Sequence, residues 1–216
     1  MYRRLAAGLV GVCAVLGANG LAAAAPDDAV PPVSAAAAAV GFVDVRTVVP
    51  DAMIDLRYAT ADNFVGIPLY PADARCLVHE SLAPGLATAA ATLRASGERL
   101  AFWDCYRPHD VQVRMFQDVP NPAWVAKPGP YSRSHEAGRS VDVTIAGADM
   151  GTGFDDFTPR ATAYATDGVS PSAQANRARL RDAMSAGGLA VYSGEWWHFD
   201  GPGAGVQRPI IDVPVN

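Results

Sequence analysis

The chain has 216 residues, of which half are hydrophobic and 18% are charged, and its net charge is −5 at neutral pH. This length suits one domain with a sizeable core, and the composition is that of a globular protein rather than a disordered or membrane-embedded one. The acidic balance lacks the basic footprint that nucleic acid or an anionic membrane requires, so we expect neither partner.

The N-terminus has the layout of a secretory signal peptide. Arg3 and Arg4 precede an apolar run that ends in small residues at 22–25. The run is nearly long enough to span a bilayer, so a membrane anchor is the alternative. Its alanine-rich end favours cleavage. We therefore predict a signal peptide at 1–24, a flexible Pro/Ala-rich leader at 25–41, and a secreted or cell-envelope protein without stable membrane insertion.

Residues 42–216 are predicted to form one α+β domain with an antiparallel sheet and flanking helices. Alternating or β-branched residues predict strands at 42–48, 52–58, 99–105, 140–145, 189–193 and 195–200. The turn-rich segment at 61–76 is predicted to be an ordered loop.

Three helices are predicted from their start and stop signals. The first is Ala- and Leu-rich and runs from Ser81 to about Ser96, before Gly97. The second has Pro108 in its first turn and ends near Gln117. The third begins at Ser170 or Ser172 and ends at Gly187 and Gly188.

Two short motifs carry possible metal ligands. His135 stands seven residues before Asp142 in SHEAGRSVD, and Glu195 stands three residues before His198 in GEWWHFD. A catalytic zinc site needs three protein ligands and one open position, which two imidazoles and one carboxylate supply. Glu195 is suited to take a proton from metal-activated water. The spacing alone also allows structural histidines, because Arg139 interrupts the commoner H-E-x-x-H pattern.

The motif DCYRP places Arg107 after a predicted buried strand and before a helix-starting proline. A buried arginine needs an anionic partner. That partner is either the oxyanion of a tetrahedral intermediate or a structural carboxylate, and the sequence leaves both open.

Cleavage of the signal peptide removes Cys13 and leaves Cys76 and Cys105. Two cysteines in an oxidising compartment can pair, and the alternative is two buried thiols. We expect the disulfide.

Taken together, DCYRP, SHEAGRSVD and GEWWHF resemble the VanX-type D-alanyl-D-alanine dipeptidases, which are zinc peptidases with the Hedgehog/D,D-peptidase fold. IDLRYATADNFVGIPLY and MGTGFDDF extend the resemblance over about residues 42–200. It implies one zinc ion held by His135, Asp142 and His198. It also implies that Glu195 is the catalytic base and that Arg107 stabilises the transition state.

The resemblance further implies a small D,D-dipeptide as substrate. The substrate's ammonium group then falls on Asp155, with Asp156 as the neighbouring alternative, and Ser134 is a further substrate contact. Arg133 stands where the family usually has serine, so the exact substrate is less defined than the reaction. Ser140 replaces the usual alanine.

The remaining polar residues near these motifs match no ligand position. His79 and His109 are predicted to be structural or surface residues, and Glu136 a solvated charge.

Two rival functions remain. One is a peptidoglycan D,D- or L,D-carboxypeptidase of the same fold, and the other is a non-catalytic secreted metal-binding module. The presence of both Glu195 and Arg107 argues against the module. The sequence does not indicate an oligomeric state.

Overall fold

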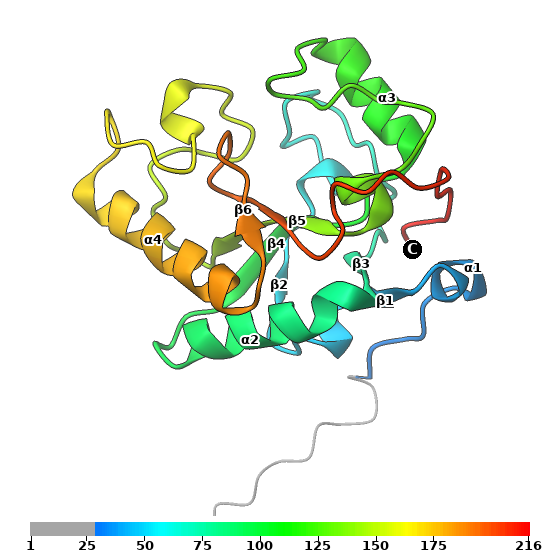
Figure 1. Cartoon of the computed structure of the whole chain (residues 1–216), viewed down its shortest axis with the longest axis horizontal. Coiled ribbons are helices and arrows are strands. Elements are labelled where there is room, and N and C mark those ends of the chain that lie inside the picture. Colours follow the sequence, from blue (N-terminus) through cyan, green and yellow to red (C-terminus); the bar gives the residue numbers. More distant parts are fainter. Residues whose placement is uncertain (1–28) are drawn as a thin grey trace, which may run out of the picture.

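A computed structural model describes residues 29–216, and its centre is a five-stranded sheet (Figure 1). The strand order is β2–β4–β5–β7–β6, with bounds Met53–Ile54, Leu100–Asp104, Ser140–Ile145, His198–Asp200 and Ala190–Val191. A separate antiparallel pair joins β1 (Phe42–Asp44) to β3 (Leu77–His79). The predicted α+β class is confirmed. The predicted signal peptide at 1–24 lies outside the described residues.

Helices α2 (Ala83–Arg94) and α4 (Pro171–Ala186) pack against each other beside the sheet, and α3 (His109–Asp118) lies apart from them (Figure 1). A Cβ atom on Gly85 would lie 2.3 Å from the carbonyl oxygen of Gly187, so the two helices approach more closely here than a side chain allows. None of the helices described is long and apolar enough to cross a membrane.

Five short 3-10 segments complete the described part, at Val45–Thr47 (η2), Arg57–Ala59 (η3), Glu80–Leu82 (η4), Ser134–Ala137 (η5) and Pro159–Ala161 (η6). Two of them shorten predicted strands. The strand predicted at 42–48 ends at Asp44, whose carboxylate accepts a hydrogen bond from the backbone of Arg46 and starts a turn. The strand predicted at 52–58 gives way to η3.

Two further strand predictions are wrong in detail. β2 runs parallel to β4, whereas the other pairings of the main sheet are antiparallel as predicted. The strand predicted at 195–200 begins only at His198, so Glu195 lies in the preceding turn.

The prediction of a flexible leader at 25–41 is wrong for its second half. Residues Ala35–Ala39 form α1, which Ser34 caps and in which Ala37 is fully buried. The guanidinium of Arg75 donates hydrogen bonds to the carbonyl oxygens of Pro31 and Pro32. Tertiary contacts therefore order a segment whose sequence has no apolar periodicity.

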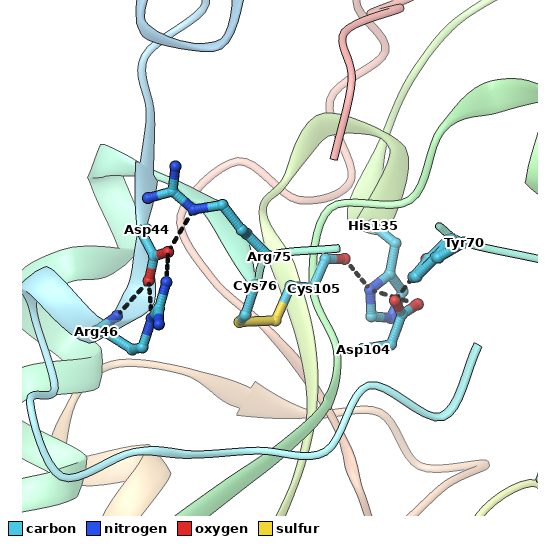
Figure 2. The surroundings of a disulfide bond; sticks show 8 residues. All are labelled: Asp44, Arg46, Tyr70, Arg75, Cys76, Asp104, Cys105 and His135. Carbon is cyan, nitrogen blue, oxygen red and sulfur yellow. Dashed lines mark hydrogen bonds and ion pairs between the residues drawn. A yellow bond between two sulfur atoms is a disulfide. The ribbon is translucent and has the colours of Figure 1, made fainter. Parts of the chain in front are cut away.

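The disulfide between Cys76 and Cys105 joins the residue that precedes β3 to the residue that follows β4. Figure 2 shows an ion-pair cluster centred on Asp44 on one side of the bond and His135 on the other. The carbonyl oxygen of Cys105 lies 2.8 Å from Nδ1 of His135. The bond therefore braces a backbone segment that contacts a predicted metal ligand.

We predict that Cys76→Ser/Cys105→Ser lowers the free energy of unfolding by about 3–4 kcal/mol, because the bond closes a loop of 29 residues in the unfolded chain. Denaturant unfolding of the oxidised wild type and the double variant measures this difference. Equal midpoints and slopes would show that the bond does not constrain the unfolded chain.

Candidate functional site

Three side chains with metal-binding atoms converge beside the central sheet. Nε2 of His135 lies 3.0 Å from Nδ1 of His198, and Oδ1 of Asp142 lies 3.2 Å from the first and 3.0 Å from the second. Two imidazole nitrogens and one carboxylate oxygen match the donor set of a catalytic zinc site. The structure therefore brings together the three predicted ligands.

Strand pairing places two of these ligands together. Asp142 on β5 lies opposite His198 on β7, and Asp104 on β4 lies opposite Asp142. The register of β4 and β5 shifts between Phe102 and Asp104, which is a β-bulge. A bulge re-aims the side chains that follow it. Asp104, Asp142 and His198 consequently form a row across three strands.

His135 reaches the row from η5, which Gly138 caps at its C-terminal end. Gly138 has a φ of +60°, and a Cβ there would lie 2.7 Å from the ring of Phe42. Both facts favour glycine at this turn. The backbone N–H of Arg107 donates to the carbonyl of His135 at 3.1 Å, which ties the two predicted functional segments together.

Hydrogen bonds on the far side of each imidazole determine which nitrogen carries a proton. Nδ1 of His135 faces the carbonyl of Cys105, and Nε2 of His198 lies 3.1 Å from Oδ1 of Asp200. Carbonyl and carboxylate oxygens only accept, so these nitrogens donate. In the neutral rings the other two nitrogens then direct lone pairs at each other and at Asp142. A cation stabilises that arrangement, so the residues fit a metal ion.

The ionisation of the cluster reflects the same demand for positive charge. Burial lowers the pKa of His198, but the hydrogen bonds that its protonated ring donates to Asp142 and Asp200 outweigh burial and raise this pKa to about 10, so a proton on Nδ1 can also supply the positive charge that the cluster requires. Burial likewise raises the pKa of Asp142, but His135 and His198 hold it well below its usual range.

Glu195 lines the same cavity as the three converging side chains. Burial raises the pKa of Glu195 to about 7. The negative charge of Asp142 adds to this effect, and positive charge on His198, His135 and Arg107 opposes it. A carboxyl group with a pKa near neutrality can both accept and release a proton at physiological pH.

Asp104 and Gln112 hold the guanidinium of Arg107. Nε and Nη2 donate to Oδ2 of Asp104 at 2.9 and 2.7 Å, and Nη1 donates to Oε1 of Gln112 at 2.7 Å. Asp104 also accepts from the hydroxyl of Tyr70 at 2.6 Å. Each Nη nitrogen keeps a second proton, and Arg107 lines the cavity. Arg107 thus has a structural partner and remains able to donate to a bound group.

Asp155 lines the cavity from a left-handed backbone conformation, with a φ of 55°. Its Oδ2 accepts from the hydroxyl of Tyr58 at 2.9 Å. Burial, together with the negative charge of Asp142, raises the pKa of Asp155 well above its usual range. A cationic group bound beside it would restore the carboxylate. Asp156 instead lies 3.7 Å from Arg160, so the geometry favours Asp155 over its neighbour.

The cavity has a volume of about 430 Å³, which is in the usual range for small-molecule sites. Phe64 and Phe157 add aromatic walls. Arg133 and the exposed Lys127 add positive charge, and Trp124 stacks on Phe157 at a centroid distance of 5.3 Å.

Two residues in the η5 segment differ from expectation. Ser134 lines the cavity, but its hydroxyl donates to Ser140 at 2.8 Å, so its only proton is not free for a substrate. Glu136 was predicted to be solvated, which is wrong. It is 6% exposed, and Oε1 lies 2.6 Å from Nδ1 of His109, because η5 turns this side chain inward. His109 and His79 lie outside the ligand cluster, as predicted.

Three residues of the site were not predicted from the sequence: Asp104, Tyr58 and Asp200. Asp104 opens the DCYRP motif and Tyr58 closes IDLRY, so both lay inside segments already noted. Asp200 follows His198 by two residues, and this alternation on a predicted strand places both on one face.

Comparison with known proteins gives consistent results. The D-ala-D-ala dipeptidase family of M15 peptidases matches residues 38–216. The chain is 38% identical over 176 residues to a D-alanyl-D-alanine dipeptidase of Escherichia coli, covering 79% of this chain and 90% of that protein. It is 29% identical over 201 residues to one of Enterococcus faecium, covering 82% and 99%.

Among solved structures, the LD-carboxypeptidase LdcB overlaps 59% of this chain and 60% of its own, with 18% identity and a TM-score of 0.42. The overlap is partial.

Proposed function

We propose that this chain, which belongs to the D-ala-D-ala dipeptidase family, is a zinc-dependent dipeptidase that cleaves D-Ala-D-Ala. The convergence of His135, Asp142 and His198 in one cavity with Glu195 and Arg107 carries the proposal. A module that only binds metal has no use for a base with a pKa near 7 or for an arginine with free donors, so catalysis explains more of the site.

Each residue of the site then has a role. Zinc, when bound, polarises the scissile carbonyl and lowers the pKa of water. Glu195 takes a proton from the attacking water and passes it to the nitrogen of the leaving D-alanine. Arg107 donates its free Nη protons to the carbonyl oxygen as negative charge develops there. Asp104 and Gln112 keep the guanidinium in place.

Charge complementarity orients the substrate. A free dipeptide carries an ammonium group at one end and a carboxylate at the other. Asp155 is the buried acid suited to the ammonium, while Arg133 and Lys127 are cavity cations that can face the carboxylate. A cavity of about 430 Å³ favours such a small substrate over a long peptide.

We also propose that the protein acts outside the cytoplasm. The signal-peptide pattern at 1–24 and the Cys76–Cys105 disulfide support export. An exported enzyme does not reach the cytoplasmic D-Ala-D-Ala pool, so wall turnover or D-alanine scavenging fits better than glycopeptide resistance. The N-terminal sequence of protein recovered outside the cytoplasm tests export. Growth on D-Ala-D-Ala as nitrogen source, with and without the gene, tests the role.

The first prediction from the proposed function concerns the metal. The purified chain should bind one zinc ion, and a chelator should abolish hydrolysis of D-Ala-D-Ala until zinc is restored. Asp142→Ala and His198→Ala should lose the ion because each removes one of three ligands. His109→Asn, at a histidine outside the cluster, should keep it. Metal analysis of the three variants decides, and full zinc content in Asp142→Ala would refute the site.

The second prediction concerns the base. Glu195→Gln should keep its zinc but lose on the order of 10²–10⁴-fold in kcat. In the wild type, kcat/KM should fall as pH drops through a value at or below about 7, because the base works only when deprotonated and the positive charge of bound zinc opposes the rise in its pKa that burial causes. If the fall of kcat/KM at low pH persists unchanged in Glu195→Gln, another group is responsible for it.

The third prediction concerns the substrate's amine. Hydrolysis of N-acetyl-D-Ala-D-Ala should be slower than that of D-Ala-D-Ala by on the order of 10²-fold, which corresponds to about 3 kcal/mol for a lost buried ion pair. Asp155→Asn should remove most of this preference, and Asp156→Asn, the matched control, should retain it. Equal rates on both substrates would favour the carboxypeptidase alternative and leave the zinc chemistry intact.

A further inference from the structure

Strands β5 and β7 present two neighbouring cross-strand pairs to the cavity side of the sheet. Asp142 lies opposite His198, and Ser140 lies opposite Asp200. Residues two apart on a strand share a face, so the second pair is on the face that carries the ligands. The proposed catalytic roles use the first pair and leave the second unexplained.

The second pair belongs to a chain of hydrogen bonds that ends on a ligand. Oδ1 of Asp200 accepts from Nε2 of His198 and from the hydroxyl of Ser140. Because a carboxylate only accepts, Ser140 uses its single proton on Asp200. Ser134, 2.8 Å from Ser140, must then be the donor between the two serines. The direction of every bond in the chain is thereby fixed.

This series of hydrogen bonds anchors the side chain of Asp200, which would otherwise be free to turn. The side chain of Asp200 is 42% exposed, whereas Ser140 is fully buried. Ser134 starts the chain from a constrained turn with a φ of 50°. Its N–H donates to Ala204 at 2.8 Å, and its carbonyl accepts from Arg139 at 3.0 Å. A rigid turn and a buried strand residue therefore fix the orientation of an exposed carboxylate.

We propose that Asp200, Ser140 and Ser134 are positioning residues that keep the proton of His198 on Nε2 and its Nδ1 lone pair directed at Asp142 and His135. This inference rests on the proposed zinc function. Asp200 acts on the ligand directly, and the serines act through Asp200. A histidine that carries its proton on Nδ1 cannot bind the metal there, so the device stabilises the metal-binding form of the ligand.

Zinc affinity tests this role without reference to catalysis. Competition with a chromogenic chelator measures the zinc dissociation constant of the full mature chain. Asp200→Ala should raise that constant about 10–100-fold, as loss of a ligand's hydrogen-bond partner typically does. Ser140→Ala should raise it on the order of 10-fold, and Ser134→Ala should raise it by less.

Thr144→Val is the matched control. Thr144 lies on β5, four residues beyond Ser140 and on the same face, and its buried hydroxyl has no hydrogen-bond partner within residues 29–216. Its removal should leave the zinc dissociation constant unchanged. An equal loss of affinity in Thr144→Val and Ser140→Ala would show a general effect of β5 and overturn the proposal.

A double-mutant cycle separates action through Asp200 from independent effects. Ser140→Ala should change nothing further in the Asp200→Ala background, because its only route to His198 has been removed. Additive losses in the double variant would contradict this.

A second measurement needs no metal. In the metal-free chain, NMR should detect a downfield Hε2 proton of His198 that exchanges slowly because it is bonded to Asp200. Exchange should quicken in Ser140→Ala and not in Thr144→Val. Unchanged exchange in Ser140→Ala would overturn the inference. If exchange quickens in Ser140→Ala but the wild-type protein binds no zinc, the proposed function is rejected, whereas the positioning role of Asp200, Ser140 and Ser134 is retained.

Discussion

Pairing of β5 with β4 on one side and β7 on the other sets Asp104, Asp142 and His198 in one row. A shift of register by one residue would turn each side chain to the opposite face of the sheet. The same register buries Val141 and Phe199 completely, so the packing that stabilises the sheet also fixes the row. The bulge in β4 is the one local departure, and it brings Asp104 into line with its neighbours.

Burial and neighbouring charges give three carboxyl groups around this row different pKa values. The pKa of Asp142 is lowered by two histidines, while burial raises those of Asp155 and Glu195. Environments that push carboxyl pKa values apart assign them different roles. A ligand, a base and an ammonium receptor can therefore be built from three acids in one cavity. Arg107, held by Asp104, supplies the permanent positive charge that offsets them.

Much of the fold followed from local patterns. The helices α2, α3 and α4 and the strand β5 lie within a few residues of their predicted bounds, because periodicity, proline, glycine and serine caps act locally. The lengths of the short strands were overestimated. An alternating sequence can also form a 3-10 turn when a side chain such as that of Asp44 caps the turn. The ordered structure at residues 31–39 was missed because it depends on residues distant in the sequence: Ala37 packs in a cluster with Tyr58 and Tyr106, and Arg75 holds the carbonyls of Pro31 and Pro32.

The family and the candidate ligands could be identified from residue types in short motifs, because chemistry limits which side chains hold a zinc ion. The groups that hold those ligands in place could not be identified from the motifs. Asp104, Asp200 and the carbonyl of Cys105 act through contacts between segments far apart in the chain or through orientation on a strand, and neither leaves a spacing rule in the sequence. Glu136 was likewise predicted to be solvent-exposed because it is charged, but the turn in which it lies buries its side chain. Side-chain chemistry is local to a residue, whereas tautomer, pKa and hydrogen-bond direction depend on neighbours that only folding brings close.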